Sequence, residues 1–248
     1  MKLKLGRLPR KHDDNVKMMA HLMRRLPIPA SKYDWTKGQT QFGMMLNDSL
    51  GDCTCAAVYH AKQIWSLNAS KEDTQPDSSV LSLYEKACGY VPGEPSTDQG
   101  GVEQNVLNYL KSVGIPLVNG QADKIIGYIE CNPRNIDEVK LSVQDFGLSY
   151  IGFDVPANIF AADGTPNDIW QYEPGASIEG GHAVIIVAYD PNYLTVVSWG
   201  GLYKMTYEFF VNYCDESYAI IAKDWFNKIG KTPLGMSEPQ LAALLSSF

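Results

Sequence analysis

The sequence lacks any long hydrophobic run. None of the apolar stretches in its 248 residues approaches the roughly 20 residues that a membrane-spanning helix needs. Residues 1–29 also lack the continuous apolar stretch and the small-residue cleavage site of a secretory signal. We therefore expect a soluble protein that contacts no membrane, is not secreted through a signal peptide, and resides by default in the cytoplasm.

Cysteine is also scarce, with five residues, namely Cys53, Cys55, Cys88, Cys131 and Cys214. This number is odd and too small for a disulfide scaffold, which predicts reduced thiols. Cys53 and Cys55 form a C-x-C pair, but no second cysteine pair or histidine pair at ligand spacing completes a zinc site. Glycine motifs for phosphates or dinucleotides are absent as well. We therefore expect no metal and no cofactor, and we expect the four cysteines other than Cys53 to be small buried side chains.

Charge is unevenly distributed along the chain. Residues 1–32 contain nine Lys or Arg and two Asp, a net charge of +7, so the total of −7 leaves −14 for residues 33–248. Such a basic arm can bind nucleic acid, bind an acidic partner, or fold back onto its own acidic body. We favour protein contact, within the chain or with a neighbour, over nucleic acid.

Hydrophobic spacing predicts a helix-rich first half and a strand-rich second half. The first predicted helix carries Cys53, Ala57, Ala61 and Ile64 on one face and has Asp52 as its N-cap. Further helices are expected over 79–91, 102–113, 133–147 and 237–247. Strands are expected over 124–131, 148–155, 182–190, 193–200 and 218–225. This order predicts an α+β fold with a cleft between two lobes.

The expected domain organisation has three parts. A basic N-terminal arm covers 1–32, the main domain covers 33–233, and a C-terminal helix or tail covers 234–248. Within the main domain, the helical lobe spans about 47–120 and an antiparallel β lobe spans about 121–225.

Cys53 is the strongest candidate for chemistry. A helix N-terminus stabilises a thiolate through its unpaired N–H groups and its dipole, and the thiolate then needs an imidazole. His60 lies seven residues along the same helix, roughly 10 Å away by helical rise, which is out of reach. His182 opens a predicted strand after Gly180 and Gly181, which allow a backbone or a substrate to approach closely. The alternative is a histidine whose hydrogen bonds are satisfied at a strand end.

An ordered set of residues carries a resemblance to a known family. Asp34-Trp35, Asn47, Cys53, His182-Ala183-Val184 and Ser198-Trp199-Gly200 follow one another, and a glycine turn at 98–101 precedes a helix. This order resembles the papain-like cysteine peptidases over about residues 33–225, which implies their two-lobed fold. The Asn-Asp-x-x-Gly-Asp-Cys motif at 47–53 further resembles papain-like proteins encoded by phages.

The resemblance implies a role for each matching residue. Cys53 would be the nucleophile, and His182 would be the general base and later the acid. The backbone N–H of Cys53 and the amide of Asn47, which stands where the family has Gln, would form the oxyanion hole. Ser198 would replace the Asn that orients the imidazole, with Trp199 shielding that contact, although Val197 is the other possible match. Asp52 would oppose formation of the thiolate.

Two functions of different classes follow. The first is a cysteine hydrolase, a peptidase acting on a peptide or protein substrate, weakened by the missing Asn. The second is a catalytically inactive structural protein of a phage virion, whose arm, residues 1–32, holds a neighbouring virion protein. The corresponding locations are the host cytoplasm and the virion. The arm is shorter than the family's usual pro-segment, which argues against inhibition by a long leader and leaves open a shorter arm in the cleft.

Overall fold

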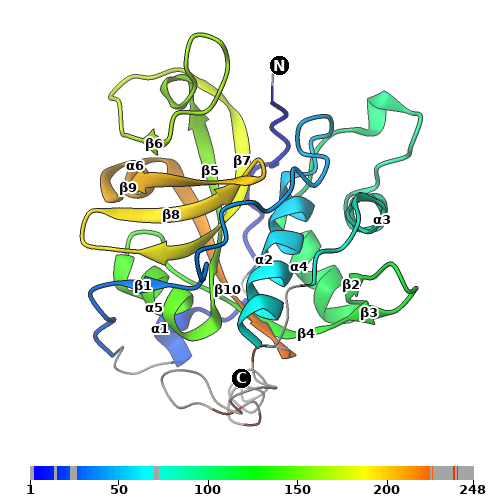
Figure 1. The fold of residues 1–248 in the computed structure, drawn as a ribbon, viewed down its shortest axis with the longest axis horizontal. Coiled ribbons are helices and arrows are strands. Elements are labelled where there is room, and N and C mark those ends of the chain that lie inside the picture. The colour runs from blue at the N-terminus through cyan, green and yellow to red at the C-terminus, as the bar shows by residue number, and fades with distance from the viewer. Residues whose placement is uncertain are drawn as a thin grey trace.

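The structure of the protein is a computed structural model that describes residues 3–13, 16–22, 27–69, 73–223, 225, 237 and 239. Two lobes lie side by side, one mainly helical and one built on a β-sheet (Figure 1). The predicted α+β architecture, with a helical lobe followed by a β lobe, is confirmed. Within the described part of the chain, no helix is both long enough and apolar enough to cross a membrane.

The helical lobe is organised around one long buried helix. Its elements are α2 (Cys53–Ala69), α3 (Asp77–Cys88), α4 (Glu103–Ser112) and the small hairpin of β2 (Ile115–Pro116) and β3 (Ala122–Asp123). All of the first fourteen residues of α2 are buried, which fits its many small side chains. Helix α3 ends where Gly89 adopts a positive φ of 82°, a conformation that favours glycine.

The second lobe is an eight-stranded sheet that contains the strands predicted from the sequence. Its strands are β1 (Tyr33–Asp34), β4 (Ile125–Glu130), β5 (Ser149–Pro156), β6 (Ile169–Trp170), β7 (Ile178–Tyr189), β8 (Tyr193–Ser198), β9 (Gly201–Thr206) and β10 (Cys214–Ala222). The order is β4-β10-β5-β7-β8-β9-β6, and β1 pairs with β7. Among these strands, each pairing is antiparallel except that of β6 with β9. The predicted antiparallel lobe is therefore mostly antiparallel, with one parallel edge.

Two segments of this lobe differ from the sequence prediction. The strand expected over 193–200 ends at Ser198, because Trp199 and Gly200 form a two-residue turn with φ values of 44° and 78°. Positive φ at both positions is typical of a type I′ hairpin. The chain continues into β9 and then α6 (Tyr207–Tyr213), neither of which was predicted. Helix α6 is capped by Thr206, whose Oγ1 accepts from Phe209 N at 3.1 Å.

The remaining helices flank the sheet. A four-residue helix, α1 (Met19–Leu22), lies in the N-terminal arm, and α5 (Ile136–Phe146) packs against β5, β7 and β10. Short 3₁₀ turns cover Pro95–Thr97 and Ala157–Ile159. The helix expected over 237–247 falls outside the described residues, apart from two isolated positions.

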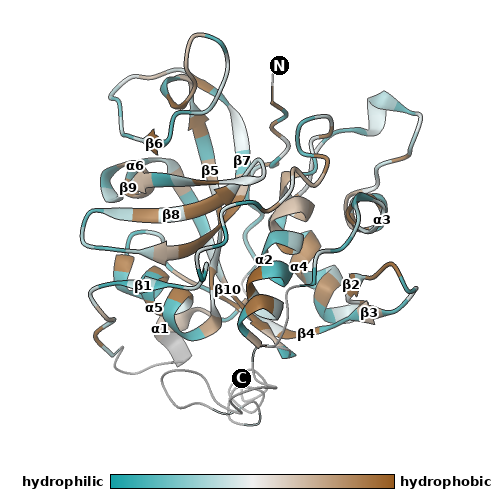
Figure 2. Cartoon of the chain, viewed as in Figure 1, coloured by the Kyte–Doolittle hydropathy of each residue, from teal (hydrophilic) through white to brown (hydrophobic). Residues whose placement is uncertain are grey.

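Two hydrophobic cores meet at the boundary between the lobes. One joins α2, α3 and α4 to β4 and β10, and the other lies in the β lobe around β5, β7, β8 and α6. Figure 2 shows the hydrophobic stretches along β8 and α2, with more hydrophilic loops around them. Tyr150 of β5 links the lobes by donating to the backbone carbonyl of Thr54 in α2 at 2.9 Å. Helix α2 also packs against β7, so the two lobes meet along α2.

Candidate active site

The N-terminal arm runs between the two lobes (Figure 1), and we refer to the space that it occupies, between Gly101 and Gly181, as the groove. On the helical side, Gly101 N donates to Gly6 O at 2.7 Å, and Leu8 N donates to Gly101 O at 2.8 Å. On the sheet side, Arg7 N donates to Gly181 O at 3.1 Å. The arm is thus bonded by its backbone to both walls, so its first residues contact the chain's own body.

Glycines line the groove where the arm approaches most closely. A Cβ on Gly181 would lie 2.6 Å from Arg7 O, and a Cβ on Gly100 would lie 1.9 Å from Gly6 O. A Cβ on Gly6 itself would lie 1.8 Å from Gly51 O. The close backbone approach predicted for Gly180 and Gly181 is therefore present, and the approaching backbone is the arm.

Cys53 opens α2 at the floor of this groove. Its side chain is buried, and the backbone N–H groups of Ala183 and Gly6 lie within hydrogen-bonding reach of the sulfur. Burial raises the pKa of the thiol to about 12, against the lowering effect of these two N–H groups. With the arm in place, Cys53 is a neutral thiol at pH 7.

His182 lies on β7, next to Ala183, and is also buried. Its Nε2 lies 2.8 Å from the hydroxyl of Ser198. The indole of Trp199 stacks on the imidazole with ring centroids 4.3 Å apart and an interplanar angle of 10°. Within the described residues, the other ring nitrogen, Nδ1, has no hydrogen-bond partner. If Nε2–H donates to Ser198, the lone pair of Nδ1 remains available as a base.

Burial also sets the charge of His182. It lowers the pKa of the imidazole to about 3, with a smaller contribution from His60. The imidazole is therefore neutral at pH 7, as is the thiol of Cys53. No hydrogen bond joins Cys53 to Nδ1 of His182 in this closed state.

The structure distinguishes the two candidates for the family's missing Asn. Ser198 ends β8 with its side chain on His182, whereas Val197 is buried in the β-ladder between Ile185 and Leu202. The tight turn at Trp199 and Gly200 holds both the hydroxyl and the stacking indole against the same imidazole. Of the two candidates, Ser198 therefore contacts His182 and Val197 does not.

Asn47 and Asp52 contact each other, and Asp52 directly precedes Cys53. The Asn47 amide donates at 3.4 Å both to Asp52 Oδ1 and to Leu50 O, so it is engaged in its own loop. The Asp52 carboxylate was expected to cap α2, but it accepts from Asn47, while its backbone carbonyl accepts from Cys55 N at 2.7 Å. Burial raises the pKa of Asp52 well above its ordinary value, which weakens the expected repulsion of a thiolate.

The other candidate residues have structural contacts. His60 is buried, its Nε2 lies 3.0 Å from Gly43 O, and burial lowers its pKa to about 4. All five cysteines are free thiols, and Cys88 is only half-buried, with its sulfur 3.9 Å from that of Cys55. In the part of the chain that is described, no group of three or more His, Cys, Asp or Glu side chains is arranged to hold a metal ion.

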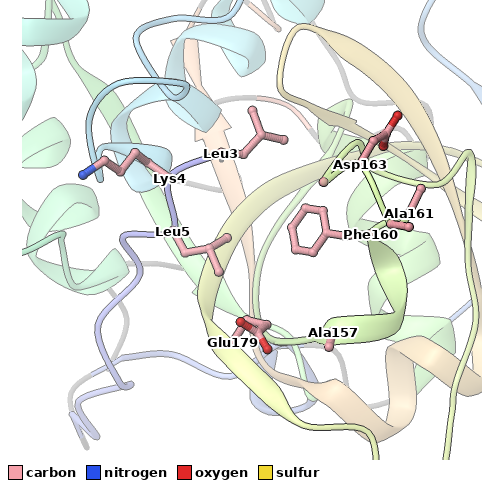
Figure 3. A pocket seen from close by; sticks show the side chains of 10 residues that line it. Leu3, Lys4, Leu5, Ala157, Phe160, Ala161, Asp163 and Glu179 are labelled. Atoms are coloured by element: carbon pink, nitrogen blue, oxygen red, sulfur yellow. The ribbon is translucent and has the colours of Figure 1, made fainter. Parts of the chain in front are cut away.

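A cavity of about 750 Å³ lies between the first residues of the arm and the segment 157–164 of the β lobe. Figure 3 shows Phe160 on one side of this cavity and Leu3 and Leu5 of the arm on the other. Phe160 also contacts Trp199, with ring centroids 5.7 Å apart. Unfilled space therefore remains between the arm and residues 157–164 of the β lobe even while the arm is present.

Sequence reasoning missed the side chain that occupies the groove next to Cys53. Arg7 is buried against Glu216 and Asp215 of β10, with Glu103 of α4 also nearby. The opposite charges of arm and body were the available signal. They did not identify which of the nine arm cations enters the groove.

Comparison with solved structures identifies the fold of the chain. No protein-family model and no curated protein matches the sequence. Xylellain, a cysteine protease from Xylella fastidiosa, has a TM-score of 0.66 at 20% identity, with 89% of this chain and 97% of that chain covered.

Two more distant sequences align over similar lengths. Procathepsin B from Trypanosoma congolense gives a TM-score of 0.62 at 12% identity, covering 89% of this chain and 87% of that one. Bromelain from Ananas comosus, in complex with the E64 inhibitor, gives 0.56 at 15% identity, covering 78% and 100%. The chain therefore has the papain-like fold that these cysteine proteases share.

Proposed function

We propose that the protein is a papain-like cysteine hydrolase that cleaves peptide amide bonds through an acyl-enzyme on Cys53. One observation carries the proposal. The imidazole of His182 is held on one side by Ser198 and Trp199, its other nitrogen has no partner among the described residues, and the backbone N–H of the next residue, Ala183, reaches the Cys53 sulfur. Buried polar atoms normally have a hydrogen-bond partner, so a histidine that only packs at a strand end is expected to have both ring nitrogens bonded.

The chemistry follows from these positions. Nδ1 of His182 removes the thiol proton, the sulfur attacks the carbonyl carbon, and the imidazolium then protonates the leaving amine. Water hydrolyses the resulting thioester with His182 as the base. The Cys53 N–H, at the first turn of α2, has no intrahelical acceptor and can donate to the oxyanion. Asn47 stays the predicted second donor, and its amide would first have to leave Asp52.

The closed groove explains why both groups are neutral. Thiolate and imidazolium are charged, so they form only when water or a polar substrate replaces the arm. Displacement of the arm lowers the pKa of Cys53 and raises that of His182, which favours the ion pair. The described conformation is therefore a latent form of the proposed enzyme.

The test uses the intact protein and an epoxide inhibitor of the E64 type, the compound bound in the bromelain structure. Intact-mass measurement follows adduct formation in wild type, Cys53→Ala and Gly6→Ala. Any side chain at position 6 collides with Gly51, so Gly6→Ala forces the arm to shift. We expect a single adduct that is absent in Cys53→Ala and forms faster in Gly6→Ala.

Two variants serve as controls. Cys88→Ala removes a half-buried thiol, and Lys11→Ala removes an exposed arm charge, so both should react like wild type. If neither wild type nor a folded Gly6→Ala protein forms an adduct at Cys53, the proposed hydrolase is rejected.

The structural role in a virion stays a prediction. It rested on the missing Asn and on the basic arm, and several residues of that arm are bonded to the chain's own groove. Purification of virions with and without the protein would test it directly. The likeness to phage-encoded proteins stays a prediction on the same footing.

A further inference from the structure

The side chain of Arg7 fills a pocket lined by four carboxylates. Nε donates to Glu216 Oε1 at 2.8 Å, and Nη2 lies 2.7 Å from the same oxygen and also bonds Asp215. Glu103 and Asp154 lie farther off, at 3.7 Å and 3.9 Å. The side chains of Glu103 and Glu216 are fully buried, whereas those of Asp154 and Asp215 are half-exposed at the rim.

A glycine on β5 leaves room in the pocket for the guanidinium of Arg7. A Cβ on Gly152 of β5 would lie 2.1 Å from Arg7 Nε and 2.5 Å from Glu103 Oε1. Gly152 therefore leaves the space in which the guanidinium lies. Tyr218 OH donates to Glu216 Oε2 at 2.9 Å and so fixes the carboxylate that receives two nitrogens of Arg7. A forked contact of this kind suits Arg better than Lys.

Glu103 gives an independent indication that the pocket takes a ligand. Both of its carboxylate oxygens are buried and, among the described residues, have no hydrogen-bond partner. Buried carboxylates are otherwise paired or hydrogen-bonded, because their desolvation is costly. Glu103 faces the pocket, so its position is explained by a cation that occupies the space.

The pocket lies next to the reacting sulfur. The N–H of Gly6 reaches the Cys53 sulfur, and Arg7 is the following residue of the arm. When the arm leaves, its cation leaves with it, and two fully buried carboxylates remain in the open groove. A substrate that places a cation between these carboxylates forms the ion pairs that the arm gives up on leaving.

We infer that this four-carboxylate pocket selects peptide substrates by an arginine, or more weakly a lysine, side chain near the scissile bond. The inference rests on the proposed hydrolase, and Arg7 is the occupant of the same pocket in the latent form. The arm and the substrate therefore compete for one site.

Binding is tested without catalysis. Arg7→Ala in a Cys53→Ala background empties the pocket, and the melting temperature is measured with acetyl-arginine amide, acetyl-lysine amide and the uncharged isostere acetyl-citrulline amide. We expect a saturable rise with arginine, a smaller rise with lysine and none with citrulline. The melting temperature of the Cys53→Ala protein that keeps Arg7 should not change with any of the three amides, because Arg7 fills its pocket. Equal responses to arginine and citrulline, or none to arginine, overturn the inference.

A second variant covers the case in which Arg7→Ala does not fold. Arg7→Lys keeps a cation but loses the forked contact, so arginine amide should still raise its melting temperature more than citrulline amide does. The absence of that difference in a folded Arg7→Lys protein overturns the inference equally.

Selection is tested on fluorogenic peptides that differ only in arginine or citrulline. In Arg7→Ala we expect kcat/KM to be at least about tenfold higher for the arginine peptide, since a buried acceptor is left unpaired by the isostere. Adding Glu216→Gln should remove most of that ratio, while adding the exposed Glu208→Gln on α6 should keep it. Hydrolysis without a preference rejects the pocket and keeps the hydrolase. Selective binding without any hydrolysis rejects the hydrolase and keeps the pocket.

Discussion

Two buried clusters contact neighbouring residues of the arm, and one is neutral whereas the other is charged. Gly6 reaches Cys53 of the neutral cluster, and Arg7 is the cation of the charged cluster. Cys53 and His182 are both neutral, because burial raises the pKa of the thiol to about 12 and lowers that of the imidazole to about 3. Arg7 is also buried, but a guanidinium keeps its proton and needs carboxylates around it. In the proposed latent form, the arm therefore covers two groups that are neutral and is held in place by a third, Arg7, that stays charged.

This difference separates retention of the arm from inhibition of the thiol. In the proposed enzyme, the ion pairs of Arg7 hold the arm in position. The pKa values of Cys53 and His182 depend on whether the arm or water occupies the groove. Changes at Arg7 should act first on stability and then on access to Cys53. Changes at Ser198 should act on the chemistry while the arm stays bound.

The largest effect is expected from Arg7→Ala. Removing one partner of a buried ion pair costs about 3–5 kcal/mol, because the remaining charges lose their compensation. Urea unfolding should show this loss; guanidinium chloride is unsuitable, because guanidinium would enter the same pocket. The exposed Lys11→Ala is the matched control and should change stability by less than about 0.5 kcal/mol. Equal stabilities of Arg7→Ala and Lys11→Ala would mean that the four carboxylates do not hold the arm.

The cost of Arg7→Ala should also depend on pH. Burial raises the pKa of Glu103 well above its ordinary value and raises that of Glu216, while Arg7 lowers both. Between the ordinary and the raised pKa, the folded chain binds more protons than the unfolded chain, so stability falls as pH rises. Removing Arg7 raises both values further and widens this window.

Unfolding of wild type and Arg7→Ala at pH 5 and pH 8 measures that dependence. The deficit of the variant should be larger at pH 8, where both carboxylates would be charged without a counter-ion. A deficit that is larger at pH 5 would contradict the assignment of Glu103 and Glu216 as the buried acids of the pocket.

A smaller loss is expected from Gly152→Ala. The added methyl group collides with the guanidinium and with Glu103, and overpacking of this kind costs roughly 1–3 kcal/mol. Because the collision is with the arm's side chain, the epoxide should also react faster with Cys53. Gly175→Ala is a poor control, since its φ of 80° brings backbone strain. Ala157→Gly, which changes side-chain volume elsewhere in the groove, should leave the Arg7 contacts intact and the reaction slow.

The sequence singled out Cys53 and His182 of the neutral cluster, but it did not single out Arg7 or Glu216 of the charged one. Cys53 at a helix start and His182 at a glycine-flanked strand are local patterns, and the ordered motifs relate them to each other. The pair of Arg7 and Glu216 spans 209 positions, and no local spacing encodes it. Long-range ion pairs depend on the assembled groove, so their identity needed the structure.

The turn after Ser198 was missed for a different reason. Trp199 has a positive φ, which is rare for a bulky residue, and the run of β-branched residues before it favoured a longer strand. Stacking on His182 and the antiparallel return of β9 stabilise that conformation. Both contacts are tertiary, and so the local sequence could not show them.

The smallest effect on stability, and the one that probes the neutral cluster alone, is expected from Ser198→Ala. It removes the hydroxyl on Nε2 of His182 and leaves a buried donor without its partner, which costs about 1 kcal/mol. In a Gly6→Ala background with the arm displaced, kcat should fall roughly tenfold with little change in KM, because the imidazole loses its orienting contact. Ser198→Thr keeps a hydroxyl and should restore part of kcat. A change confined to KM would place Ser198 in substrate binding, and an unchanged kcat would show that stacking by Trp199 is enough to orient His182.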